Sequence, residues 1–425
     1  MEAGVVDLLT GSVAARRAMG AGGAAMSAPM KSRERAGSAS LRKGEAATSL
    51  RYKMMALARE RENVISLGRG DPDLHTQPAI VEDGLARFAE AAGAEMVAGD
   101  GGPVRGLLPL REGIARRYAR EKGVDVDPAT EIAITNGAQE GLFLAMLALV
   151  DPGDRVACQD PRYSSYDQAI GTAGGDIVPV PTGGDRPFEL GGDELRQHAR
   201  GCKLLVFVNP SNPTGSCVGP QGVRDLAGAA ADLGMVVVSD EIYEDVVFRE
   251  EPFLSLLAAD GARGRTVVLS GFSKAYAMTG FRVGYLIGPP AFIDAVEAIK
   301  STTSGPCPAF SQYTAVAALE ADPDPRPEYL ARYRCRRQAL IDGFADLGVP
   351  HGPHGGGLFM WADVSRFGMD AENFCYRLLD EAGVLMFPGA SFGARWRNWV
   401  RVSLLCPEAR ILESMERIRR FARSL

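Results

Sequence analysis

Short apolar runs alternate with helical patterns between residues 131 and 288, and this alternation limits the fold more than any other feature of the chain. Each run has the length and the β-branched content of a buried strand. The segments 140–150 and 219–234, which lie between such runs, read as helices. Strands that alternate with helices predict an α/β fold, with a mostly parallel sheet and helices on both of its faces. The expected strands are 131–135, 155–160, 176–180, 203–210, 235–240, 266–274 and 284–288.

A second, smaller unit is expected toward the end of the chain. From about residue 326 the sequence predicts a long helix, strands at 357–365 and 400–405, a helix at 371–383 and a terminal helix, which together make an α+β unit. The length of 425 residues agrees with two or three domains. The predicted division is a flexible N-terminal arm at 1–47, the N-terminal part of the small domain at 48–90, a large domain at 91–315 and the C-terminal part of the small domain at 316–425.

Charge and hydropathy argue against several classes of partner. The net charge of −6 disfavours a nucleic-acid surface. The longest apolar runs, such as 141–150, fall well short of the roughly 20 residues that span a bilayer, so we expect no membrane segment. The seven cysteines are odd in number and form no CxxC pair, which is typical of reduced thiols and predicts a cytoplasmic protein.

The strand in "MVVVSDEIYEDVVF" (235–248) ends abruptly in acidic residues. Asp240 follows three consecutive valines, and Tyr243 comes about one turn later. Two interpretations are open at this point. The acids can simply cap the next segment after the chain has left the core. Alternatively, Asp240 faces a cationic ligand, because ligands of open α/β sheets collect at the carboxyl ends of the strands.

Two other strand ends also carry groups suited to a ligand. The stretch 136–139, "NGAQ", opens a helix with small residues and can present backbone N–H groups to an anion, although a plain tight turn fits equally well. The stretch 209–216, "NPSNPTGS", holds Asn212 in a proline-stiffened bend, which can also be an ordinary turn.

The strand residues "TVVLS" (266–270) are followed by "GFSKAYAMTGFRVGY" (271–285), which contains Lys274 and Arg282. Lys274 is one of only seven lysines among 47 basic residues. A lysine that stands alone on a surface is usually inert, but a desolvated lysine can become a nucleophilic amine, which an arginine cannot. Pyridoxal phosphate uses the whole set that these strand ends offer: an amine, a carboxylate, a phenol, an amide and a cradle for a phosphate.

Eight stretches of the chain, in this order, resemble the class I/II aminotransferase family of fold-type I pyridoxal-phosphate enzymes. They are "GRGDPD" (68–73), "TNGAQE" (135–140), "PRYSSY" (161–166), "NPSNPTG" (209–215), "SDEIYEDVVF" (239–248), "SGFSKAYAMTGFRVGY" (270–285), "PGASFG" (388–393) and "VRVSLL" (400–405). The resemblance covers the chain from about residue 48 to the end. It implies an enzyme that moves an amino group between an amino acid and a 2-oxo acid.

The resemblance also implies a role for each matching residue. Lys274 would bind the cofactor as a Schiff base and then move the proton, and Asp240 would pair with the ring nitrogen. Tyr243 and Asn212 would bond the phenolate oxygen of the cofactor. Tyr163 would stack on the ring. The phosphate would be bound by Arg282, by Ser270 or Ser273, and by the backbone of Ala138 and Gln139. The substrate would be bound by Arg401, Asn212 and Gly70.

One part of the chain departs from the family pattern. The family places a tyrosine near Gly101 that reaches across a homodimer to the cofactor phosphate, yet no tyrosine lies between residues 89 and 117. Three explanations of the missing tyrosine are open: a substitution without effect, a wider substrate pocket, and a changed reaction. The alternative to transamination is therefore an elimination, replacement, condensation or oxidation of an amino acid in a specialised biosynthetic pathway.

Two further motifs are weak. "GASFG" (389–393) and "HGGG" (354–357) resemble parts of an α/β-hydrolase, but no histidine and no aspartate follow Ser391, as that fold requires. His351 and His354 have no third ligand cluster beside them, so we predict no metal site.

Overall fold

The computed structural model describes residues 50–93, 102–183 and 187–425. The predicted arm at 1–47, and Gly101 beside the missing tyrosine, lie outside the described residues. The helices are α2 (Leu50–Arg59), α3 (Pro78–Gly93), α4 (Leu108–Lys122), α5 (Ala138–Leu149), α6 (Ser164–Ala173), α7 (Gly192–His198), α8 (Pro220–Asp232), α9 (Phe272–Ala275), α10 (Pro290–Thr303), α11 (Ala309–Leu319), α12 (Arg326–Asp346), α13 (Ala371–Ala382) and α14 (Glu408–Arg423). The strands are β1 (Ile65–Ser66), β2 (Ile132–Thr135), β3 (Arg155–Asp160), β4 (Asp176–Pro181), β5 (Leu204–Val208), β6 (Val236–Asp240), β7 (Thr266–Gly271), β8 (Gly284–Ile287), β9 (Phe359–Asp363), β10 (Val384–Leu385), β11 (Phe387–Pro388) and β12 (Trp399–Ser403).

A mostly parallel sheet forms the centre of the larger unit. In the described part of the chain it has seven strands, in the order β2-β8-β7-β6-β5-β3-β4. Neighbouring strands from β4 to β7 are parallel, whereas β8 runs antiparallel to both β7 and β2. Every strand lies at one of the predicted apolar runs, so the predicted α/β architecture is confirmed.

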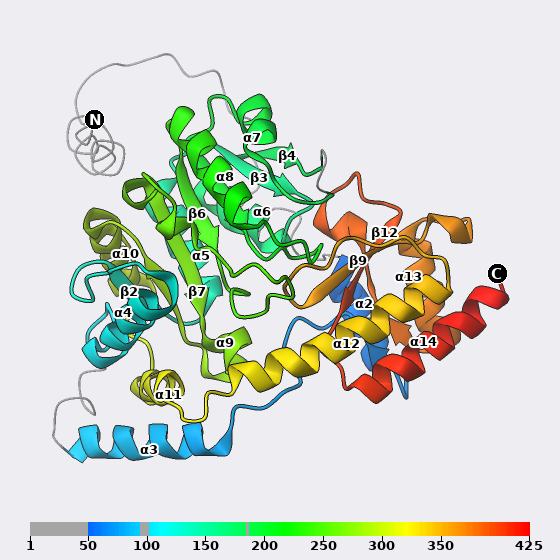
Figure 1. Cartoon of the computed structure of the whole chain (residues 1–425), viewed down its shortest axis with the longest axis horizontal. Coiled ribbons are helices and arrows are strands. Elements are labelled where there is room, and N and C mark those ends of the chain that lie inside the picture. Colours follow the sequence, from blue (N-terminus) through cyan, green and yellow to red (C-terminus); the bar gives the residue numbers. More distant parts are fainter. Residues whose placement is uncertain (1–49, 94–101, 184–186) are drawn as a thin grey trace, which may run out of the picture.

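Helices cover both faces of this sheet because successive side chains of a strand point in opposite directions (Figure 1). In β6, Val236 and Val238 belong to the same core cluster as residues of α5, α6 and α10. Val237, between them, packs with residues of α7 and α8 in another cluster. The continuous run of valines is therefore buried from both sides, which is why the strand shows no polar alternation.

The smaller unit contains an antiparallel sheet in the order β11-β12-β9, with α12 and α14 packed side by side (Figure 1). β1 pairs in parallel with β10, which attaches residues 65–66 to this unit. The α3 helix instead packs against α11, which also contacts α4. The domain boundaries drawn from the sequence stay a prediction. Among the described residues, no helix is both long enough and apolar enough to cross a membrane.

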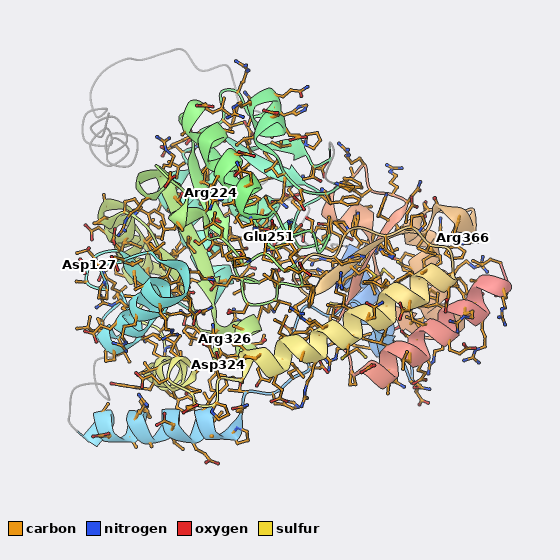
Figure 2. All side chains as sticks on the ribbon, in the orientation of Figure 1. Asp127, Arg224, Glu251, Asp324, Arg326 and Arg366 are labelled. Carbon is orange, nitrogen blue, oxygen red and sulfur yellow. The ribbon has the colours of Figure 1, made fainter. Side chains whose placement is uncertain are left out.

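An ion-pair cluster joins the two units at the start of α12, where Figure 2 labels Arg326. Arg326 binds Glu121 of α4 and Asp245, each at 2.8 Å. Arg117 binds the same Asp245 at 2.8 Å. Burial by itself would raise the pKa of Asp245, but the two arginines outweigh it and lower that pKa. The cluster therefore ties the long helix to the loop that follows β6.

The parallel register brings the ends of the central strands together. Val208 of β5 lies opposite Asp240 of β6, and Asp240 lies opposite Leu269 of β7. The segments that follow β5 and β7 carry Asn212 and Lys274. The polar groups predicted at three separate strand ends thus emerge at one edge of one sheet.

Gly284, the first residue of β8, allows this strand to pass close to the start of α5. A Cβ atom at position 284 would lie 2.5 Å from the backbone nitrogen of Ala138 and 2.6 Å from the carbonyl carbon of Gly137. We expect Gly284→Ala to lower the free energy of unfolding by about 1–3 kcal/mol, because overpacking forces the backbone apart. Urea denaturation of both proteins measures this. Gly280→Ala is the control, since nothing lies within 4 Å of its added Cβ; equal losses in the two variants would contradict the steric explanation.

Candidate active site

A cavity of about 610 Å³ lies at this edge of the large sheet, and residues of the smaller unit close its other side. Phe359 of β9, Phe387 of β11 and Arg401 of β12 come from the smaller unit. All of the predicted site residues except Ser270 line this cavity. They are Gly70, Ala138, Gln139, Tyr163, Asn212, Asp240, Tyr243, Ser273, Lys274, Arg282 and Arg401.

Asp240 is a buried carboxylate, only 7% exposed, at the end of β6. The hydroxyl of Tyr166 donates to its Oδ2 atom at 2.8 Å, and the backbone N–H of Ile242 donates to Oδ1 at 3.2 Å. Burial raises the pKa of Asp240 to about 6, against the opposing effects of the Tyr166 hydrogen bond and of the nearby Lys274 charge. The carboxylate is therefore incompletely compensated by the protein, and a cationic partner would be favourable there.

Lys274 lies on the short helix α9, directly after β7. Its Nζ atom donates to the carbonyl oxygen of Gly70 at 2.6 Å and lies 3.6 Å from a carboxylate oxygen of Asp71. Burial lowers the pKa of Lys274, although Asp71 acts in the opposite direction. A lowered pKa increases the fraction of neutral amine, which is the nucleophilic form.

Asn212 connects two other side chains of the cavity. Its amide nitrogen donates to the hydroxyl oxygen of Tyr243 at 3.4 Å, and its amide oxygen accepts a hydrogen bond from Arg401 at 3.0 Å. Both ends of the amide are thus engaged, which holds its orientation. The expectation that the proline-stiffened bend after β5 presents Asn212 to the cavity agrees with this geometry.

Arg401 is a buried cation that lacks an anion. Its side chain is 2% exposed, it donates to the carbonyl oxygen of Gly68 at 2.9 Å, and its Nε atom has no acceptor among the described residues. No carboxylate in the described ranges lies within 4 Å of it. The rings of Phe359 and Phe392 lie 4.0 and 4.8 Å from its guanidinium carbon. Burial lowers the pKa of Arg401 to about 9, so it stays charged at neutral pH and would gain from a bound carboxylate.

The start of α5 forms an anion-binding corner together with Arg282. Gly137 has φ +80° and no side chain caps the helix, so the first N–H groups, at Ala138 and Gln139, have no intrahelical partner. Arg282 donates to the carbonyl oxygen of Asn136 at 3.2 Å, which holds it beside the helix start. Backbone N–H groups and a guanidinium that converge in this way suit a phosphate group.

Ser270 does not take part in this corner. Its hydroxyl lies 3.5 Å from the carbonyl oxygen of Glu241 and 3.4 Å from a carboxylate oxygen of Glu244. Alternation along β7 explains this position: Leu269 lines the cavity, so the next side chain points to the opposite face. Of the two predicted serines, the structure therefore places Ser273 at the cavity and Ser270 outside it.

Several residues of the cavity escaped the sequence analysis. Tyr166, the donor to Asp240, lies in α6, three positions after Tyr163, which immediately precedes this helix; its nearness to a predicted site residue was an available signal. The rings of these two tyrosines meet edge to face, with their centroids 5.7 Å apart. Asp71, beside Lys274, and Arg51, from α2, carried no recognisable local signal.

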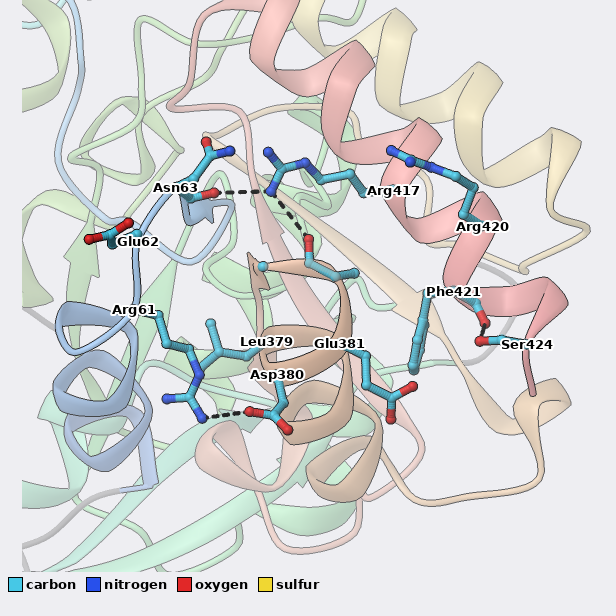
Figure 3. A pocket seen from close by; sticks show the side chains of 12 residues that line it. Arg61, Glu62, Asn63, Leu379, Asp380, Glu381, Arg417, Arg420, Phe421 and Ser424 are labelled. Carbon is cyan, nitrogen blue, oxygen red and sulfur yellow. Dashed lines mark hydrogen bonds and ion pairs between the residues drawn. The ribbon is translucent and has the colours of Figure 1, made fainter.

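A second hollow, of about 850 Å³, lies between the end of α2 and the helices α13 and α14 (Figure 3). Arg61 there pairs with Asp380 at 2.8 Å. Arg417 donates to the carbonyl oxygens of Asn63 at 3.0 Å and of Ala382 at 3.2 Å (Figure 3). These groups already satisfy one another, and the hollow has no lysine to serve as a nucleophile.

Comparisons with known proteins agree with the geometry. The sequence pattern of the family described as "Aminotransferase class I and II" matches residues 62–418. An aspartate aminotransferase of Pyrococcus abyssi is 31% identical over 87% of this chain and 95% of its own length. An aromatic-amino-acid aminotransferase of Thermococcus litoralis is 30% identical over 86% and 93%. The solved structure of aspartate aminotransferase from Thermus thermophilus with maleate superposes with a TM-score of 0.82, at 32% identity, over 91% of this chain and 100% of that one.

Both of these relatives are named as aminotransferases, but their names give different amino acids. Their match favours transamination over the elimination, replacement, condensation or oxidation that the missing tyrosine left open. The chain therefore belongs to the class I and II aminotransferase family, and it is a fold-type I, pyridoxal-phosphate-dependent transferase that moves an amino group between an amino acid and a 2-oxo acid.

Proposed function

We propose that Lys274 binds pyridoxal phosphate covalently and that Asp240 pairs with the ring nitrogen of this cofactor. The observation that carries the proposal is that a part-buried amine with a lowered pKa and a buried carboxylate with a raised pKa line the same cavity. The anion-binding corner formed by α5 and Arg282 opens into this cavity as well.

The remaining donors also fit this cofactor. The start of α5, Ser273 and Arg282 would bind its phosphate, and Tyr163 would stack on its ring. Tyr243 and the amide of Asn212 would donate to its phenolic oxygen. The raised pKa of Asp240 supports its pairing with a ring nitrogen, because a cation within hydrogen-bonding distance lowers that pKa again and keeps the carboxylate charged.

When bound, the cofactor supplies an aldehyde that condenses with amines and a ring that accepts electrons from the α-carbon of the substrate. Lys274 would act as the base and move the α-proton of the substrate at its Nζ atom. The carbonyl oxygen of Gly70 and the carboxylate of Asp71 hold that atom in place. Arg401 binds the α-carboxylate of the substrate, with Asn212 and Gly70 beside it, and so orients the α-proton toward Lys274.

We further propose that the enzyme is a cytoplasmic homodimer with its cavity near the subunit boundary. Tyr52 and Met55 of α2 lie at the cavity and are 61% and 38% exposed, which leaves apolar surface for a second copy to cover. A reducing compartment agrees with the cysteines, which all lie in the described ranges without pairing to one another.

Replacing the proposed nucleophile tests the covalent role. Lys274→Ala should abolish transamination, because no other amine of the described cavity lining can replace it. After borohydride reduction of the wild-type enzyme, peptide mass mapping should find the cofactor on the peptide that contains Lys274. Lys203→Ala is the matched control, because Lys203 pairs with Asp151 and Asp154 away from the cavity. Cofactor mass on a different lysine would refute the assignment.

Tyr166→Phe tests how Asp240 is held. This change keeps the ring but removes the hydroxyl that lowers the pKa of Asp240, so that pKa should rise further. We expect kcat to fall about tenfold, since one lost hydrogen bond to a charged group costs about 1.5–3 kcal/mol at most. The acidic limb of the kcat/KM pH profile should also move to higher pH. A profile identical to that of the wild type would mean that Tyr166 only fills space.

In the cofactor-free protein, the buried charge of Asp240 should lower the free energy of unfolding. The pKa of Asp240 is about 6 when folded and 3.8 as an ordinary aspartate, so the folded state binds its proton more tightly. This shift lowers the free energy of unfolding. The loss is absent below pH 3.8, develops as the pH rises through 6, and reaches about 3 kcal/mol above pH 7.

Asp240→Asn removes this cost, so the cofactor-free variant should be more stable than the wild type at pH 8, with a difference that shrinks as the pH falls from 6 to 4. Urea denaturation across this range measures the difference. The exposed Asp260 provides the control substitution Asp260→Asn. A difference that does not depend on pH would rule out this explanation.

A further inference from the structure

A further arginine, Arg51, lines the cavity in addition to the cations assigned above. Arg51 lies near the start of α2, the first helix that the structure describes, and it faces the same cavity as Arg401. Counted over its lining residues, the cavity has five basic and two acidic side chains. A cofactor phosphate and one substrate carboxylate account for only part of this excess of positive charge.

Arg51 is held in place by neutral groups. It donates to the hydroxyl of Ser164 at 2.6 Å, and its guanidinium carbon lies 5.6 Å from the ring centroids of both Tyr163 and Phe392. Its Nε atom is buried and has no acceptor among the described residues. No carboxylate in the described part of the chain lies within 4 Å of its guanidinium, so this oriented cation also lacks an anion.

Arg51 and Arg401 converge on the same part of the cavity. The Phe392 ring lies within cation–π distance of both, 5.6 Å from Arg51 and 4.8 Å from Arg401. Two guanidinium groups that share one aromatic ring repel each other unless an anion neutralises them. Arg401 is deep, beside Gly68 and Phe359, whereas Arg51 lies over Tyr163. One small carboxylate on Arg401 would therefore leave Arg51 unpaired.

We propose that Arg51 binds the second carboxylate of a dicarboxylic amino acid or 2-oxo acid whose α-carboxylate lies on Arg401. This inference rests on the proposed function and adds the class of substrate to it. A planar guanidinium can bind the distal carboxylate with two parallel hydrogen bonds, and the neutral contacts to Ser164, Tyr163 and Phe392 leave those donors available.

Arg69 is the competing candidate within the same cavity. It is exposed and no aromatic ring or hydrogen-bond partner among the described residues holds it, so binding a carboxylate there would cost more side-chain entropy. Arg51 is already oriented, which favours it as the ligand.

The experiment compares glutamate with glutamine, which have nearly the same shape and differ in the distal charge. The rate of the half-reaction, followed by the cofactor absorbance, gives kcat/KM for each. Arg51→Met should lower kcat/KM for glutamate by about 30- to 100-fold and change that for glutamine by less than about threefold. The loss should appear mainly in KM. Arg51→Lys should recover part of it, which also covers the case in which the methionine variant folds poorly.

Binding without turnover gives an independent readout. Calorimetric titration of the cofactor-loaded enzyme with maleate, a dicarboxylate, should show tighter binding than titration with cis-2-butenoate, in which a methyl group replaces one carboxylate. Arg51→Met should remove this difference. Arg59→Met, at an exposed position of the same helix outside the cavity, is the matched control and should preserve it.

Three results would overturn the proposal: equal losses for glutamate and glutamine in Arg51→Met, a wild-type enzyme that does not favour glutamate, or a selective loss in Arg69→Met instead. These failures are separate from failure of the proposed function. If Lys274 carries no cofactor and no amino acid changes the cofactor absorbance, the proposed function itself is wrong.

Discussion

The site depends on a carboxylate that the fold buries at the end of its central strand. Asp240 is surrounded by sheet and helices, and a charge in such a place is costly without partners. Tyr166, the backbone of Ile242 and the charge of Lys274 reduce that cost, yet the pKa of Asp240 still lies near 6. A protonated ring nitrogen would supply the missing compensation. Burial thus makes the unpaired charge of Asp240 costly in free energy, and the binding of a cationic ligand beside it favourable.

Positive charge lacks compensation in the part of the cavity proposed to bind the substrate. Arg401 and Arg51 are oriented cations without carboxylate partners among the described residues, and both are held by aromatic rings and neutral oxygens. Neutral contacts fix the position of a guanidinium without satisfying its charge, so its affinity for an incoming anion is retained. In the proposed complex, the large sheet and the segments after its strands would present most of the ligands of the cofactor, whereas β12 and α2 would present the two arginines that bind the substrate.

Much of this arrangement could be predicted because it follows from local patterns. The run of valines before Asp240 predicts a buried strand, and the rule that ligands collect at the carboxyl ends of strands predicts that Asp240, Asn212 and Lys274 meet. The two serines near Lys274 could not be separated, since the choice depends on which face of β7 Ser270 occupies and on the change from β7 to α9 before Ser273. Tyr166 was missed because its role depends on a contact between α6 and the end of β6, which lies 74 positions further along the chain.

The amino-acid sequence by itself determined the order of strands and helices, the family, and the amine and carboxylate that lie at neighbouring strand ends. These follow from short-range periodicity and from the geometry of parallel strands, which the sequence encodes within a few residues. Only the tertiary structure decided that Arg51, near the start of the described chain, and Arg401, near its end, approach the same Phe392 ring. The physical reason is that α2 packs against β10 and β11 of the smaller unit, whose neighbouring strand β12 carries Arg401, and no local pattern of residues specifies such packing.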